Sequence, residues 1–262
     1  MKLFDVKEIN KDIAISFIEE HHYTPMLPKL TKHWLGGFVE NELVAVLTLG
    51  WGTQPKQTIK KLFPHLDTKD YYEIGKMCLT DEMPRNSETQ FLSQVKAWIK
   101  ENTEIDLLYT MADGIMGKAG YVYQAFNFFY GGKFRTAVYR DMITGEKIHP
   151  RTARKLCEEN AIFLQKEKVH WLTPDYMKTK NLERIDGLMF RYMLPMSKKA
   201  KKHFKKSTVD WTLNYPKHKD IEFWKQIELG KYERMKDWPV FTFDNMKYNK
   251  KMSGGKLDEF MT

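Results

Sequence analysis

The spacing of apolar residues along the first half of the chain predicts alternating helices and strands. Residues 8–20 show a mostly helical spacing, and the prolines of the next segment, HHYTPMLPK, end that helix. Two β-rich runs at residues 34–39 and 43–49 then predict a hairpin. Residues 50–70 contain two glycines and two prolines, so we expect an irregular excursion from the sheet.

A strand, a helix and a second strand follow this excursion. Residues 72–79 predict a strand, and Ser87 is a plausible N-cap for a helix that ends at Asn102. The apolar run IDLLYTMAD, residues 105–113, predicts a buried strand with Asp113 at its carboxyl end.

The next elements complete a predicted α/β unit. An aromatic segment predicts a short helix over residues 121–129, with Gly131-Gly132 as its C-cap, and then a strand over residues 133–140. Short connections of this kind favour parallel neighbours, and the earlier hairpin makes the sheet mixed. The aromatic side chains of the short helix cannot all face one core, so some are expected to line a pocket while others pack on the sheet.

The second half of the chain has a different character and leads to a division into four parts. A further strand is expected at residues 187–196 and another near Trp211. We expect the end of the chain, SGGKLDEFMT, to fray. The expected parts are a catalytic core (1–144), a helical insertion (145–186), the last core strands with a basic segment (187–218), and a C-terminal extension (219–262).

Charge and composition favour a polyanionic partner. The chain has 262 residues, a formal net charge of +9 and 14% aromatic residues, which suits a protein that stacks on bases. A basic surface that serves only solubility is the alternative. The two cysteines, Cys78 and Cys157, form no disulfide framework or metal motif, and the chain shows no signal core or membrane span. We therefore expect a cytoplasmic protein with no membrane partner.

One segment concentrates positive charge. Nine Lys or Arg residues lie between Arg191 and Lys219, against the single acid Asp210, with Trp211 and Tyr215 among them. Phosphate neutralisation combined with aromatic stacking indicates nucleic-acid contact rather than a merely solvated helix face. The expected DNA-binding residues are Lys198, Lys199, Lys201, Lys202, Lys205, Lys206 and Lys217.

Three further places in the chain hold candidate catalytic or ligand-binding residues. His22 and Tyr23 follow the broken helix and could act as acid, base or ligand, or could merely cap that helix. Asp113 stands where open α/β sheets bind ligands, although it could instead cap the next helix. The loop DEMPRNSE precedes a helix, whose first backbone N–H groups can bind a phosphate, and Arg85 adds a positive charge there. The alternative is that this loop is an ordinary helix start with no ligand.

These segments together resemble the Mom family of bacteriophage DNA modification proteins, which are related to the GNAT acyltransferases. The resemblance runs over roughly residues 20–218 and is most telling in the strand, loop and helix followed by Tyr-Gln-Ala-x-Asn-Phe. The similar stretches are HHYTPMLPK, GGFVENELVAVLTLG, EIGKMCLTDEMPRNSETQFLSQVKAWIK, LLYTMADGIMGKAGYVYQAFNFFYGG, RYMLPMSKKAKKHFKK and NYPK.

The resemblance implies a GNAT-like mixed α/β fold with a splayed central sheet, and a transferase that adds a carbamoylmethyl-type group to the exocyclic amine of adenine. Such an adduct shields phage DNA from restriction. It also implies functional roles for particular residues. The implied catalytic residues are His22, Tyr23, Asp113 and Tyr130, with Asp113 or His22 as base and Tyr23 or Tyr130 as acid or orienter.

The sequence leaves open which molecule donates the transferred group. The loop Arg85, Asn86, Ser87 and Glu88 occupies the place of the GNAT pyrophosphate loop, so an acyl-CoA-type donor is one alternative. The loop lacks the glycines of that family, which argues against the usual mode of acyl-CoA binding. A His-Tyr-Asp set holding ferrous iron is another alternative. Two rival functions also remain, namely a non-catalytic DNA-binding protein with a GNAT-like fold, and an acetyltransferase acting on a protein or small amine.

Overall fold

The computed structural model describes residues 3–24, 30–52, 54–148 and 153–242. Its centre is a sheet in the order β1-β2-β3-β4-β5-β8-β6-β7, and a β9–β10 hairpin pairs with β8. The strands are β1 (Asp5–Glu8), β2 (Thr31–Val39), β3 (Glu42–Gly50), β4 (Tyr71–Leu79), β5 (Leu107–Asp113), β6 (Phe129–Asp141), β7 (Lys147–Ile148), β8 (Leu182–Pro195), β9 (Trp224–Glu228) and β10 (Lys231–Arg234).

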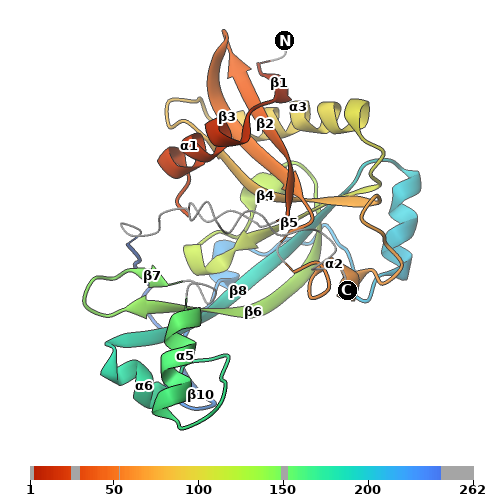
Figure 1. Cartoon of the computed structure of the whole chain (residues 1–262). Coiled ribbons are helices and arrows are strands. Elements are labelled where there is room, and N and C mark those ends of the chain that lie inside the picture. Colours follow the sequence, from red (N-terminus) through yellow and green to blue (C-terminus); the bar gives the residue numbers. More distant parts are fainter. Residues whose placement is uncertain (1–2, 25–29, 53, 149–152, 243–262) are drawn as a thin grey trace.

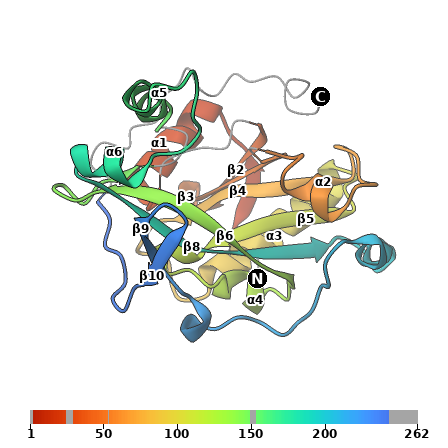
Figure 2. The same ribbon diagram turned by 90° about the horizontal axis from the view of Figure 1, so that it is seen from below.

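Helices cover both faces of this sheet (Figure 2). The helical elements are α1 (Lys11–His21), α2 (Ile59–Leu62), α3 (Ser87–Asn102), α4 (Tyr121–Ala125), α5 (Arg154–Phe163), α6 (Pro174–Thr179), η1 (Gly114–Met116), η2 (Lys199–Lys206) and η3 (His218–Asp220). Helix α1 packs on Val46, whereas α3 packs on the neighbouring residues Ala45 and Leu47. Because successive side chains of a strand point to opposite faces, α1 and α3 lie on opposite sides.

Among the strands of the described residues, β4 and β5 pair in parallel, and they separate after three residues. Tyr71–Glu73 of β4 pairs with Leu107–Tyr109 of β5. Beyond that point β4 follows β3, whereas β5 stays paired with β8 as far as Asp113. The sheet is therefore splayed at its centre, which confirms the expected mixed α/β fold with a splayed central sheet.

Two expectations about this region are wrong. Helix α4 ends at Ala125, because Asn127 takes a positive φ of 57° and the chain enters β6 at Phe129. Gly131-Gly132 therefore lie within a strand instead of capping a helix. The strand β8 lies between β5 and β6 and is antiparallel to both, so the parallel expectation holds for β4 and β5 only.

The second half contributes more strand than the sequence predicts. Strand β8 begins at Leu182, five residues before the predicted 187, and β1 and the β9–β10 hairpin have no counterpart in the prediction. No strand forms around Trp211 in the described chain, and Thr212 instead makes an isolated bridge to Tyr130. The segment SGGKLDEFMT lies outside the described residues. Within those residues, no helix is long and apolar enough to cross a membrane.

Candidate active site and basic surface

A cavity of about 840 Å³ opens where β4 and β5 separate. Its wall combines the ends of these strands with the residues that follow α1, the start of α3, the loop from Gly117 to Gly120 and the start of α4. We call this cavity the cleft. Three of the four predicted catalytic residues line it, namely His22, Tyr23 and Asp113.

His22 is held as a neutral imidazole. Its Nδ1 lies 2.9 Å from the backbone nitrogen of Thr24, which donates to it. Burial, together with the positive charge of Lys76, lowers the pKa of His22 to about 3. Since Nδ1 accepts a hydrogen bond, the ring proton belongs on Nε2. At neutral pH, the Nε2–H group of His22 can therefore donate a hydrogen bond. Because Nδ1 already accepts one, His22 has no free nitrogen with which to act as a base.

Tyr23 stacks on His22, with ring centroids 4.4 Å apart. Burial raises the pKa of Tyr23 even though 43% of the residue is exposed, and the Asp113 carboxylate and Tyr123 raise it further. The hydroxyl therefore stays protonated and can serve as a donor. The ammonium of Lys118 lies 5.7 Å from the Tyr23 ring centroid.

The two carboxylate oxygens of Asp113 have different partners. Its Oδ1 accepts a hydrogen bond from the backbone of Ile115 at 3.0 Å, so it caps η1. Its Oδ2 lies 3.3 Å from Nζ of Lys147, whose side chain is 3% exposed. The capping alternative is therefore confirmed, and the same residue also lines the cleft. Each carboxylate oxygen retains a lone pair that can accept a proton from a substrate.

Lys76 is a cleft residue that the sequence analysis missed. Its Nζ donates to the carbonyl oxygen of Thr24 at 2.7 Å. Burial lowers the pKa of Lys76 to about 8, an effect that Asp113 partly offsets and Lys147 adds to. A lysine inside the largely apolar strand YYEIGKMCL, in which Glu73 is the other charged residue, was the available signal, since a buried ammonium is rare without a partner.

The residues around Asp113 do not fit a ferrous ion. Among the described residues, no group of three or more His, Cys, Asp or Glu side chains could hold a metal. The carboxylate of Asp113 is already paired with Lys147 and acts electrostatically on Lys76, and two ammonium groups repel a cation.

The loop of Arg85, Asn86, Ser87 and Glu88 lines the cleft at the start of α3. Asn86, in the left-handed conformation at φ 72°, is the N-cap but makes no side-chain capping bond, so the prediction of Ser87 as N-cap is wrong. The Ser87 hydroxyl is buried and has no hydrogen-bond partner in the described structure. An uncapped helix start, a spare hydroxyl and Arg85 together fit a phosphate or another anionic group.

Comparison with known proteins decides the family. The model of the Mom protein family matches residues 3–217. The chain belongs to this family. The "Methylcarbamoylase mom" of Escherichia phage Mu is 28% identical over 200 residues, which are 75% of this chain and 77% of the phage Mu protein.

Solved structures with a similar fold include GNAT acetyltransferases. One is a GNAT family acetyltransferase from Elizabethkingia anophelis with acetyl-CoA bound, at 11% identity and a TM-score of 0.34, covering 74% of this chain and 99% of that one. Another is a putative acetyltransferase from Pyrococcus horikoshii, at 12% identity and a TM-score of 0.38, covering 82% and 97%.

Tyr130, which the Mom resemblance suggested as a site residue, lies away from the cleft. It belongs to β6, opposite Tyr192, and packs between that ring and Phe190. Tyr123 of α4 lines the cleft instead, and its hydroxyl interacts with Thr110. Both tyrosines belong to one aromatic segment, and the early end of α4 decides which of them reaches the site.

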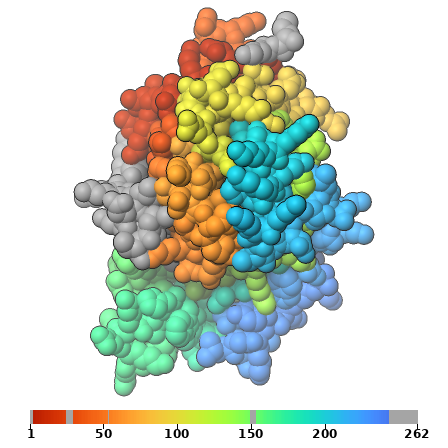
Figure 3. Space-filling model, turned by 90° about the vertical axis from the view of Figure 1, so that its right-hand side faces the viewer, coloured from red at the N-terminus to blue at the C-terminus, as the bar shows by residue number. Residues whose placement is uncertain are grey.

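The predicted DNA-binding lysines divide between two places in this Mom-family protein. Those of residues 198–206 are exposed on or beside η2, and Figure 3 shows this segment in cyan next to the orange residues of α2. His203 anchors η2 by a hydrogen bond of 2.8 Å between its Nε2 and Oδ2 of Asp106, which directly precedes β5. Asp113 ends the same strand, so η2 and the cleft stand roughly 20 Å apart. Figure 1 places η2 to the right and the end of α1 to the left.

Lys217 is the exception among these lysines. It precedes His218, whose backbone nitrogen donates to the Tyr121 hydroxyl at 2.9 Å, and Tyr121 lines the cleft. Lys217 therefore stands near the cleft.

Proposed function

We propose that this protein is a transferase that adds a carbamoylmethyl-type group to the exocyclic amine of adenine in DNA. The observation that carries the proposal is the cleft, where a neutral His22, a protonated Tyr23 and the Asp113 carboxylate face one cavity. The name of the phage Mu relative supports the group transferred. The net charge of +9 supports a polyanionic substrate.

The proposed roles follow from the hydrogen bonds. The adenine amine is a weak nucleophile because its lone pair is delocalised, so its proton has to leave as it attacks the donor. Asp113 is the base, since His22 carries its proton on Nε2. His22 and Tyr23 then donate hydrogen bonds to donor atoms on which negative charge develops.

The proposed donor is anionic. The uncapped start of α3, Arg85 and the Ser87 hydroxyl would bind its phosphate or carboxylate, and the ammonium of Lys76 adds positive charge inside the cleft. An acyl-CoA-type molecule is one donor of this class. For a carbamoylmethyl-type product, the adenine nitrogen would bond to the methylene carbon of the group while the bond from that carbon to the anionic part of the donor breaks. The amine proton would pass to Asp113, and the anionic part would leave with the bonding electrons.

The direct test is mass spectrometry of DNA from bacteria that express the protein. We expect a heavier deoxyadenosine after digestion to nucleosides, and none from cells with the His22→Ala variant at equal protein level. His22→Gln should retain more adduct than His22→Ala, because the glutamine amide can donate near the position of Nε2. Unchanged nucleosides with soluble wild-type protein would refute DNA modification in that host.

A second function, non-catalytic DNA binding, is favoured by one observation. The η2 surface stands apart from the cleft, so it can hold DNA without any chemistry. In that case DNA affinity would survive every substitution in the cleft and no adduct would form.

The η2 surface carries its own prediction. Changing Lys201, Lys202, Lys205 and Lys206 to Gln is expected to weaken DNA binding and to reduce the slope of log K against log salt by about 0.9 for each phosphate that the variant no longer neutralises. Fluorescence anisotropy at several salt concentrations measures both quantities. The matched control changes four exposed lysines around α5 and α6 (Lys155, Lys166, Lys168 and Lys178), and an equally large weakening there would deny η2 a special role.

A further inference from the structure

The last described segment of the chain contacts strands β6 and β7 and comes close to the cleft. We call residues 235–242 the C-terminal strap. Its beginning bonds to the carbonyl of Phe223 through the nitrogen of Met235, at 2.9 Å. At its other end Thr242 donates to Gly145 at 2.9 Å and accepts from the backbone of Lys147 at 3.1 Å. The strap is therefore attached to the residue that pairs with Asp113.

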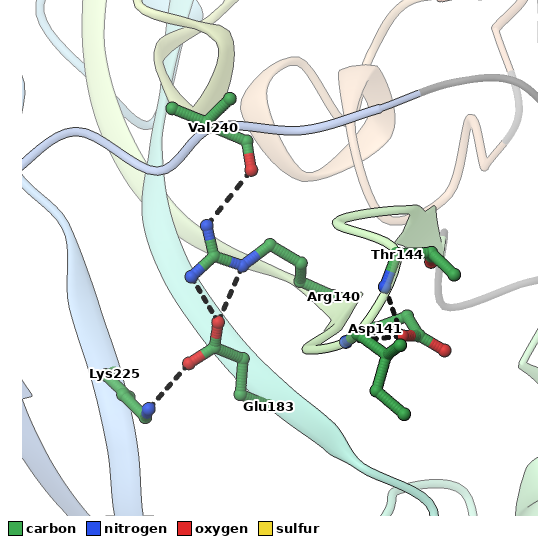
Figure 4. A network of polar contacts seen from close by, with 7 residues as sticks. Arg140, Asp141, Thr144, Glu183, Lys225 and Val240 are labelled. Carbon is green, nitrogen blue, oxygen red and sulfur yellow. Dashed lines mark hydrogen bonds and ion pairs between the residues drawn. The ribbon is translucent and has the colours of Figure 1, made fainter.

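A network of polar contacts around the buried Glu183 carboxylate holds the middle of the strap (Figure 4). Nη1 of Arg140 donates to the carbonyl of Val240 at 3.0 Å, and its Nε donates to Glu183 at 2.6 Å. Lys225 of β9 pairs with the same carboxylate at 2.7 Å. The Glu183 side chain is 5% exposed, so its charge is well shielded from water. Strands β6, β8 and β9 together position the strap.

This strap brings Trp238 to the rim of the cleft. A methyl group added to Gly117, a residue that lines the cleft, would come within 2.3 Å of Cζ3 of the indole and 3.1 and 3.3 Å of its two ring neighbours. These three distances mean that the edge of the ring points at Gly117. One face of the indole stacks on His218, with centroids 4.3 Å apart and planes at 12°, while Phe223 packs at 64°.

Trp238 is nevertheless 42% exposed, and its surroundings are both aromatic and basic. Tyr121, which shares the rim, is 53% exposed and accepts a hydrogen bond from His218. Lys118 lines the cleft beside Tyr121, and Lys217 precedes His218. Exposed rings flanked by ammonium groups are the combination that single-stranded nucleic acid recognises.

We propose that Trp238 is a stacking platform for a DNA nucleobase at the mouth of the cleft. The inference rests on the proposed function, because Asp113 is reached only by a base that has left the helical stack. An exposed ring at the rim would stack on the extruded base or on its neighbour and so stabilise the open DNA. The strap lies beyond residue 217, where the match to the family model ends, so this contact is a property of the extension.

Three variants test the platform against a merely structural role. Trp238→Leu keeps an apolar side chain against Gly117 but removes the π face, whereas Trp238→Phe keeps a smaller ring. The matched control is Trp171→Ala, since Trp171 is 45% exposed and does not line the cleft. Thermal unfolding shows whether each variant is folded.

The first measurement is affinity for a single-stranded adenine-containing oligonucleotide by fluorescence anisotropy, together with the adduct level in expressing cells. We expect Trp238→Leu to lower affinity about 10-fold and adduct in proportion, with Trp238→Phe between it and wild type. Trp171→Ala should match wild type. Equal affinity and equal adduct for a folded Trp238→Leu variant would overturn the platform while leaving the proposed function standing.

The second measurement does not depend on turnover. Oligonucleotides that carry 5-iododeoxyuridine beside an adenine are irradiated with the wild-type protein, and the cross-linked peptide is sequenced by mass spectrometry. We expect the peptide that contains Trp238. Cross-links confined to the η2 lysines would overturn the platform. Absence of adduct from wild-type cells, with cross-links at Trp238, would refute modification and retain the DNA contact.

Discussion

Asp113→Asn is expected to reduce adenine modification by at least about 100-fold, because it removes the acceptor of the amine proton. The amide is nearly isosteric and its oxygen can still accept from the nitrogen of Ile115, so the cap of η1 should survive. Adduct per deoxyadenosine in expressing cells, normalised to soluble protein, measures the effect. Retention of near wild-type adduct would remove Asp113 from the mechanism.

The same change should also destabilise the protein, which calls for a second variant. Lys147 is 3% exposed and would lose its carboxylate partner, and an unpaired buried charge costs about 3 kcal/mol or more. The double variant Asp113→Asn with Lys147→Met removes both charges and is expected to recover most of that stability without recovering activity. Recovery of activity in the double variant would mean that Asp113 serves only as a counter-ion.

Much of the cleft could be predicted from local sequence. The prolines after the first helix break it near His22, and the apolar run of residues 105–113 places Asp113 at the carboxyl end of a strand. Both signals depend on neighbours in sequence. The separation of β4 and β5 brings these two segments to the same cavity, and the family resemblance was needed to anticipate it.

Other residues of the site depend on contacts between distant segments. Lys147 reaches Asp113 from 34 residues away, through the β6–β7 turn, and Trp238 reaches Gly117 through the strap. No periodicity marks such encounters. The choice of Tyr123 over Tyr130 likewise depends on where α4 stops, at the positive φ of Asn127. Helix ends are set by single residues, whereas the aromatic pattern extends over the whole segment.

The basic segment illustrates the same limit in another way. The positive charge of this segment is evident from the sequence, and its lysines are exposed on or beside η2, as such charged residues are expected to be. The end of the sheet that it occupies is decided by the hydrogen bond of His203 with Asp106 and by the stacking of Phe204 on Trp211, with ring centroids 5.4 Å apart. DNA bound both there and at the cleft would have to run along the molecule, roughly the length of β5.

Lys76→Met is expected to lower adduct formation by about 100-fold, whereas Lys76→Arg should retain activity within about 10-fold of wild type. The reason is that the cleft uses a positive charge, which arginine keeps and methionine lacks. Arginine stays protonated in proteins, so it cannot replace a lysine that acts as a base. Loss of activity in both variants to the same extent would therefore assign Lys76 a proton-transfer role and contradict a purely electrostatic one.

The pH dependence separates these roles further. The pKa of Lys76 is about 8, so the ammonium is present below that pH and is lost as pH rises through it. In clarified lysate of expressing cells, which contains the donor, adduct formation on added plasmid should fall above pH 8 with wild type and stay flat there with Lys76→Arg. His22, with a pKa of about 3, should add no step between pH 5 and 8.

Stability and activity should move in opposite directions at Lys76. Folding lowers its pKa from the ordinary 10.5 to about 8, which means that the buried ammonium opposes folding at neutral pH by roughly 3 kcal/mol. Methionine removes this penalty, so Lys76→Met should melt at a higher temperature than wild type at pH 7, with the gap closing as pH rises above 8. An inactive variant that is more stable cannot owe its inactivity to unfolding. A variant that melts lower would instead show that the contact of Nζ with Thr24 outweighs the cost of burying the charge.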